Sequence, residues 1–112
     1  MTDIEVTFRD QLWDWLSTHF TQRDSVRLIT WKAAYPQKYV SWDEVLDVLI
    51  AFGWIDGRRF TIDEDRTAQL INPRKQQAWS KSYKQGAERL RQKGLMHPAG
   101  VTSIQSRKAS GL

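Results

Sequence analysis

Two segments in the middle of the sequence have the chemistry to hold an anionic ligand. One is FGWIDG at Phe52–Gly57, which offers a flat indole and a carboxylate that accepts hydrogen bonds. The other begins at Pro73 and carries arginine and lysine, which bind carboxylates and phosphates. We expect the two segments to form one ligand-binding surface. Its candidate residues are Trp54, Asp56, Arg74, Lys75, Trp79, Ser80 and Lys81.

A helix predicted from about Gln76 to Lys93 would position the basic segment. Its apolar stripe is Trp79, Tyr83, Ala87 and Leu90, at intervals of four, four and three residues. The N–H groups of its first turn have no partner within the helix, and basic side chains surround them. Such a helix end is a physically sound cradle for an anion.

The positive charge at this helix start needs compensation. It opposes the helix macrodipole at a cost of roughly 0.3–1 kcal/mol per residue. An internal salt bridge to one of the acidic residues Asp56, Asp63, Glu64 and Asp65 would offset it. A bound anionic ligand would do the same, and the sequence leaves both explanations open.

Trp54 and Asp56 also have an architectural interpretation. Trp54 can belong to the core, while Asp56 begins a turn in which Gly57 supplies a positive φ. In the functional interpretation they lie at the mouth of a pocket that faces Arg74 and Trp79. The sequence does not decide between the two.

The basic helix suggests a second kind of surface. Residues 1–73 carry a net charge of −4 and residues 74–112 a net charge of +8. The exposed faces of the helix could therefore contact a protein partner or nucleic acid, or could lie beside acidic segments of the same chain. The residues of this surface are Lys84, Arg89, Arg91 and Lys93.

The remaining elements follow from periodicity and capping signals. A helix at about 7–20 begins with Thr7 as N-cap, and alternation at Ser25–Lys32 predicts a strand. Ser41 and Glu44 form a capping box, and Gly53 should end that helix, whose broad apolar face makes it central. Short strands at Phe60–Ile62 and Ala68–Ile71 form a hairpin, and a last helix starts at Pro98. The predicted fold class is α+β, a mainly helical single domain with a small antiparallel sheet or hairpin.

Several classes of activity lack their sequence signals. The chain has no cysteine, and neither of its histidines, His19 and His97, has a second ligand at metal-site spacing. No phosphate-binding loop, dinucleotide fingerprint or nucleophile elbow occurs. The longest apolar run, Val48–Gly53, is too short to span a membrane. We therefore expect no catalytic residues, no metal, no cofactor and no membrane span.

A series of short motifs resembles the YdeI/OmpD-associated family, also labelled bacteriocin-protection. The motifs are YVSWDEVLDVLIAFGWIDG at Tyr39–Gly57, PRK at Pro73–Lys75, WSK at Trp79–Lys81, RL at Arg89–Leu90, GLM at Gly94–Met96 and PAG at Pro98–Gly100. The resemblance runs from about Leu28 to Lys108. It implies one domain over residues 1–112, C-terminally short relative to the family, in a bacterial and cytoplasmic protein. Tyr83 departs from the pattern, because the family usually has asparagine there.

The residues and the resemblance together predict a non-enzymatic stress protein of the antimicrobial-peptide-protection type. It would bind an anionic small ligand or a protein partner at the surface formed by FGWID, PRK and WSK. The alternative is a nucleic-acid-binding module that uses the basic helix at 75–93.

Overall fold

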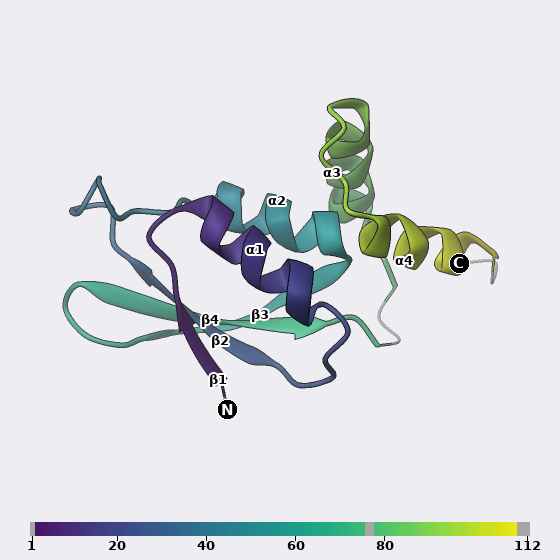
Figure 1. The fold of residues 1–112 in the computed structure, drawn as a ribbon. Helices are drawn as coiled ribbons and strands as arrows, with labels where there is room; N and C mark the ends of the chain where they lie inside the picture. Colours follow the sequence, from purple (N-terminus) through teal and green to yellow (C-terminus); the bar gives the residue numbers. More distant parts are fainter. Residues whose placement is uncertain (1, 76–77, 110–112) are drawn as a thin grey trace.

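A computed structural model of the protein describes residues 2–75 and 78–109. The elements are β1 (Thr2–Glu5), α1 (Arg9–His19), β2 (Val26–Trp31), α2 (Trp42–Phe52), β3 (Trp54–Thr61), β4 (Arg66–Pro73), α3 (Lys81–Gln92) and α4 (Pro98–Ala109). Helices α1 and α2 cover one face of the sheet, and α3 and α4 lie beyond one end of it (Figure 1). No helix among the described residues is long and apolar enough to cross a membrane.

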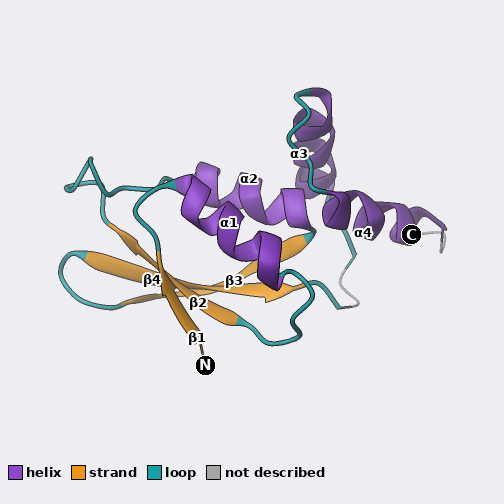
Figure 2. Ribbon diagram, viewed as in Figure 1, coloured by secondary structure: helices purple, strands orange, loops and turns teal. Residues whose placement is uncertain are grey.

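The prediction of a mainly helical domain with a small antiparallel sheet or hairpin was wrong. The four strands form one mixed sheet in the order β1-β2-β4-β3, shown in orange in Figure 2. Strand β1 is parallel to β2, while β4 is antiparallel to both β2 and β3. Strand β1 was not predicted because Thr2–Glu5 is short and largely polar. Most of β3 was not predicted because Asp56-Gly57 is typical of a turn.

Asp56 and Gly57 lie inside β3, where a β-bulge replaces the predicted turn. Asp56 pairs with Ile71 and Arg59 pairs with Gln69, so β3 has one residue more than β4 in this interval. Gly57 does not have the positive φ predicted for it. Among the glycines of the described residues, positive φ occurs at Gly53 and Gly94. A bulge turns the side chains that follow it, and this one places Arg59 on the same face as Gln69.

Helix α2 is central, as its broad apolar face predicted. Ser41 accepts a hydrogen bond from the Glu44 backbone N–H, and the Glu44 side chain accepts from the Ser41 N–H. Gly53 ends the helix with φ of 74°. Helix α2 contacts α1, α3, α4 and β3, so it holds together the parts of the fold that surround it.

Two predicted helix starts differ from the structure. Helix α1 begins at Arg9, and the backbone N–H of Thr7 donates to Gln11 Oε1 at 2.6 Å, so Thr7 does not cap it. Helix α3 begins at Lys81 because Ser80 is its N-cap. The predicted start of that helix, Gln76, lies outside the described residues.

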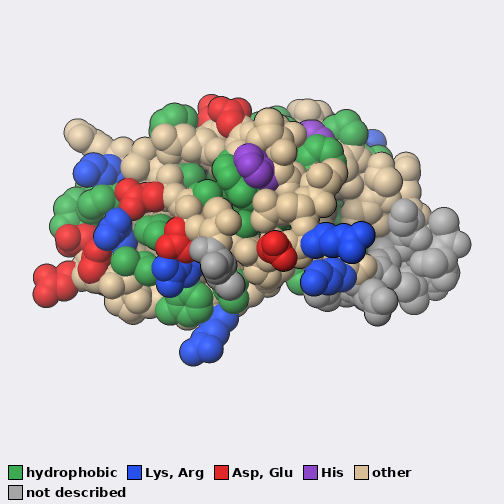
Figure 3. Space-filling model, turned by 60° about the horizontal axis from the view of Figure 1, so that its bottom comes forward, with side chains coloured by type: hydrophobic (Ala, Val, Ile, Leu, Met, Phe, Trp, Pro, Cys, Tyr) green, Lys and Arg blue, Asp and Glu red, His purple; other side chains and the backbone are tan. Residues whose placement is uncertain are grey.

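The sheet face away from the helices carries ion pairs at the end near β1. Arg27 binds Asp3 at 2.6 Å, and Arg66 binds Glu5 at 2.6 Å and Asp63 at 2.8 Å. Figure 3 shows this mixture of acidic and basic side chains toward the left of that view. Exposed pairs of this kind contribute little stability individually, about 0–1 kcal/mol each.

Candidate functional site

Arg74, the first predicted anion-binding residue after β4, lies against two aromatic rings of the α3 region. Its guanidinium carbon is 4.4 Å from the centre of the Trp79 ring and 5.6 Å from that of Tyr83. Its Nε donates to the Gly53 carbonyl at 3.3 Å, and Nη1 donates to the Ala78 carbonyl at 3.0 Å. These contacts attach the segment after β4 to the end of α2 and to the start of α3.

Tyr83 connects this cluster to Asp56. The Tyr83 hydroxyl donates a hydrogen bond to Asp56 Oδ1 and accepts one from the Asp56 backbone N–H at 3.3 Å. Burial, and secondarily the bond to this carboxylate, raises the pKa of Tyr83, so the phenol stays protonated. Tyr83 thus makes a defined polar contact at the position where the resembled family has asparagine.

Both tryptophans of the predicted surface are buried. Trp54 is 2% exposed, and its indole N–H donates to the Phe20 carbonyl at 3.2 Å. Trp79 is 4% exposed, and its indole N–H donates to Ser103 Oγ at 3.3 Å. The Trp54 bond joins β3 to the end of α1, and the Trp79 bond joins the segment before α3 to α4. Neither ring offers an open stacking surface.

The other predicted residues, Ser80, Lys81 and Lys75, lie in different environments. Ser80 accepts a hydrogen bond from the Tyr83 backbone N–H at 3.2 Å, which is the capping bond of α3. Lys81 is exposed at the first position of that helix. Lys75 is exposed too, and it lines a hollow of about 460 Å³ together with Arg74 and Arg23. Arg23 had no sequence signal that marked it.

The predicted partner surface on α3 is partly engaged within the chain. Arg89 binds Asp47 of α2 at 2.5 Å, and Arg91 binds Glu88 at 2.5 Å. Lys84 and Lys93 are exposed. Through the Arg89–Asp47 pair, the basic helix lies beside an acidic residue of its own chain, which is one of the alternatives that the sequence left open.

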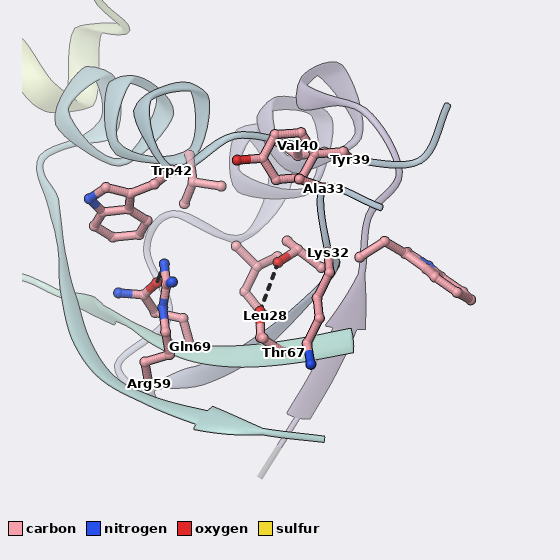
Figure 4. A pocket seen from close by; sticks show the side chains of 12 residues that line it. Leu28, Lys32, Ala33, Tyr39, Val40, Trp42, Arg59, Thr67 and Gln69 are labelled. Atoms are coloured by element: carbon pink, nitrogen blue, oxygen red, sulfur yellow. Dashed lines mark hydrogen bonds between the residues drawn. The ribbon is translucent and has the colours of Figure 1, made fainter. Parts of the chain in front are cut away.

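A different pocket lies where the sheet extends beyond the helices. It has a volume of about 220 Å³ and is enclosed by β2, β3, β4, the segment before α2 and the start of α2. Its lining residues are Leu28, Thr30, Trp31, Lys32, Ala33, Tyr39, Val40, Trp42, Val45, Arg59, Thr67 and Gln69. We call it the Arg59 pocket, and Figure 4 shows it from close by.

The guanidinium of Arg59 is held on two sides. Its carbon is 5.4 Å from the centre of the Trp42 ring, and its Nη2 donates to Gln69 Oε1 at 3.1 Å. Gln69 is 8% exposed, and its amide donates to the Gly57 carbonyl at 3.4 Å. The bulge, the indole and the buried amide therefore orient one cation at the wall of the pocket (Figure 4).

The rest of the lining combines hydroxyl groups with apolar side chains. Thr30 and Thr67 face each other across β2 and β4, with their hydroxyl oxygens 3.4 Å apart (Figure 4). Tyr39 lies on the opposite side, with its hydroxyl directed toward Trp42. The lining within the described residues includes the cations of Arg59 and Lys32 and no carboxylate. Such a pocket favours a small ligand that carries negative charge.

Sequence reasoning missed this pocket, although part of its signal was visible. In β2 the residues Val26, Leu28 and Thr30 share one face, and the face changes from apolar to polar at Thr30. A polar residue in line with core positions indicates that the core ends there. The matching change from Ile71 to Gln69 becomes apparent only with the pairing register of β4.

Metal-ligating side chains do not gather in the part of the chain that the structure describes. No group of three or more histidine, cysteine, aspartate or glutamate side chains there could hold a metal ion. His97 instead stacks on Phe52 with ring centres 4.2 Å apart. Its Nδ1 accepts a hydrogen bond from the Ala99 N–H at 3.0 Å.

The chain was compared with known proteins and families. No curated protein and no solved structure matches it. The sequence profile of one family, a domain of unknown function (DUF8412), matches residues 4–103. This range includes α1, α2, α3 and three complete strands, with the Arg59 pocket and the Arg74 cluster inside it. The chain therefore belongs to the DUF8412 family.

Proposed function

We propose that this domain is a binding module for a small anionic ligand and that the Arg59 pocket is its site. The observation that carries the proposal is the position of Arg59 between Trp42 and Gln69, in a lining that has two cations. A guanidinium held in one orientation loses little freedom when it binds a carboxylate or phosphate in a bidentate manner. This class of ligand is the one that the sequence predicted, but at a different place.

The size and lining of the pocket define the ligand further. A volume of about 220 Å³ fits a small metabolite. The negative group binds Arg59, and the hydroxyls of Thr30 and Thr67 bind other polar atoms. Apolar atoms of the ligand lie against Leu28, Val40 and the Trp42 ring.

A thermal-shift screen of small carboxylates and phosphates tests the proposal. The best compound is then titrated by calorimetry against Arg59→Ala and Arg58→Ala. Arg58 is the matched control, because its guanidinium lies over Phe60 at 5.8 Å and it does not line the pocket. We expect Arg59→Ala to weaken binding at least tenfold and Arg58→Ala to preserve it. The proposal fails when no compound binds, or when both variants lose binding equally.

The resemblance to the YdeI/OmpD-associated family supports a cellular setting for this binding. It implies protection against antimicrobial peptides, which are commonly rich in lysine and arginine. The chain has a net charge of +4, which opposes direct capture of such a peptide. We therefore propose that the domain acts in the cytoplasm, as this resemblance implies, and that it acts by binding its anionic ligand. A deletion strain should become sensitive to a cationic peptide, and Arg59→Ala should not restore resistance.

A further inference from the structure

We infer that the chain has a second ligand site, a groove at the opposite end of the fold that takes a single-chain amphiphilic anion such as a fatty-acid anion. The groove has an apolar part between the ends of α1 and α2 and the start of α4. A basic part lies beside the end of β4. Neither part belongs to the Arg59 pocket, so this inference stands independently of the proposed function.

The apolar part is a hollow of about 510 Å³. Phe20, Phe52 and Trp54 belong to its wall, as do Pro98 and Thr102 of α4. The indole N–H of Trp54 is bonded to the Phe20 carbonyl, so the polar atom of this ring is already satisfied. The wall therefore presents apolar atoms to whatever lies in the groove.

The imidazole of His97 completes this wall without adding a charge. It stacks on Phe52, and its Nδ1 accepts a hydrogen bond from the Ala99 N–H. Burial lowers the pKa of His97, which keeps the ring neutral at neutral pH. A hydrocarbon chain can lie against such a ring without leaving an unpaired charge.

The basic part is the hollow of about 460 Å³ lined by Arg23, Arg74 and Lys75. Phe20, Pro73 and Arg74 line both hollows, so the two lie side by side. Within the described residues the lining of the basic part contains no carboxylate. Toward the right of Figure 3, basic side chains lie close together, with an acidic side chain beside them.

The adjacency of the two parts selects the class of ligand. An apolar hollow alone would accept any hydrophobic molecule, and a basic hollow alone would accept any anion. In series, they match one molecule with an anionic head and an apolar tail. The head then lies among Arg23, Arg74 and Lys75, and the tail lies in the apolar hollow, against Phe20, Pro98 and Thr102.

Calorimetric titration with a series of alkanoates, each below its micellar concentration, tests the inference. Octanoate, decanoate and dodecanoate should bind with rising affinity, by up to about fourfold for each added methylene until the groove is full. Acetate and decanol should bind at least tenfold more weakly than decanoate. Equal affinity along the series, or no binding at all, overturns the inference. Binding to anionic phospholipid vesicles without binding of monomeric dodecanoate also overturns it.

Matched variants locate the bound molecule. Arg23→Glu combined with Lys75→Glu should weaken dodecanoate binding at least tenfold, whereas Arg9→Glu, at the opposite end of α1, should leave it unchanged. Thr102→Trp should block the tail, and Gln85→Trp on the exposed surface of α3 is its control. Equal losses in the variants and their controls contradict the assignment.

Indole resonances distinguish this groove from the Arg59 pocket. In a ¹⁵N–¹H spectrum the Trp54 indole signal should move on addition of dodecanoate, and the Trp42 signal should not. Arg59→Ala should bind dodecanoate as the wild type does. Movement of Trp42 alone, or loss of binding in Arg59→Ala, assigns the anion to the Arg59 pocket and overturns the inference.

Discussion

The hydroxyl of Tyr83 and the carboxylate of Asp56 form a hydrogen bond that joins α3 to β3. The same hydroxyl accepts from the Asp56 backbone N–H, and the Tyr83 ring lies against the guanidinium of Arg74. Asp56 therefore orients Tyr83 rather than facing an open pocket, and Tyr83 in turn helps to hold Arg74. The three residues act as one unit that positions α3 beside the sheet.

Tyr83→Phe should lower the free energy of unfolding by about 1–2 kcal/mol. Hydrogen bonds to charged groups contribute about 1.5–3 kcal/mol, and the partly exposed position reduces that value. Urea denaturation of Tyr83→Phe, Asp56→Ala and the double variant measures the coupling between the two residues. Additive losses would mean that the hydrogen bond does not contribute.

Stability should fall at alkaline pH because of Tyr83. Its pKa is raised above the ordinary value of 10.0, chiefly by burial. Above pH 10 the unfolded chain releases this proton while the folded protein keeps it, so unfolding becomes easier as pH rises. The contribution is complete below pH 10, and its loss is at most about 1.4 kcal/mol per pH unit before solvent screening.

Denaturation between pH 8.5 and 11 measures this effect. Wild type should lose more stability above pH 10 than Tyr83→Phe does. Tyr35→Phe is the control. The pKa of Tyr35 is also raised, by a hydrogen bond to Asp65, but the Tyr35 side chain is exposed. Identical pH slopes for wild type and Tyr83→Phe would exclude Tyr83 as the cause.

The sequence predicted the elements whose signals are local. The capping box at Ser41 and the glycine at Gly53 defined α2 at both ends, and the alternation in β2 defined that strand. Strand β1 has no such signal, since its four residues become a strand only by pairing with β2. The size of the sheet was therefore underestimated.

The site was harder to predict because it depends on pairing between distant residues. Arg59 and Gln69 meet only through the register of β3 and β4, and a bulge sets that register. Asp56-Gly57 is typical of a turn, and the sequence alone offered no reason to place a bulge there. Arg74 was predicted to bind an anionic ligand on a surface shared with Trp79. In the structure the rings of Trp79 and Tyr83 contact Arg74 itself.

Gly57→Ala should disturb the Arg59 pocket. A Cβ at this position would lie 2.6 Å from Asn72 Nδ2 and 3.1 Å from Leu70 Cβ. Overpacking of this kind costs about 1–3 kcal/mol, and relief of the clash shifts the bulge that orients Arg59. Spectra should show changed Trp42 and Gln69 side-chain signals. Gly94→Ala is a control that strains the backbone at φ of 70° with nothing within 4 Å, and it should leave those signals unchanged.

Gly100→Ala should be more damaging, because α4 meets the end of α2 at this residue. A Cβ there would lie 2.1 Å from the Ala51 carbonyl oxygen, which already accepts a hydrogen bond from the His97 N–H at 3.1 Å. The clash involves backbone on both sides, so we expect a loss of about 3 kcal/mol or more. Thr102→Ala, at an exposed position of the same helix, should stay within about 0.5 kcal/mol of wild type in urea denaturation. A small loss for Gly100→Ala would show that α4 moves away from α2 without cost.

Arg74→Ala decides between the two explanations of the basic segment. Arg74 contacts two aromatic faces and two backbone carbonyls, so its removal should destabilise the protein by about 2–3 kcal/mol without any ligand. Arg74→Lys should recover little, because an ammonium cannot stack and donate in the same plane.

Lys81→Ala is the matched control, since it removes an exposed cation from the start of α3 and should be neutral or stabilise by about 0.3–1 kcal/mol. Equal stability of Arg74→Ala and wild type would mean that Arg74 serves a ligand rather than the fold. Loss in Arg74→Ala with no loss in Lys81→Ala would identify the aromatic rings and carbonyls as the internal partners of this charge.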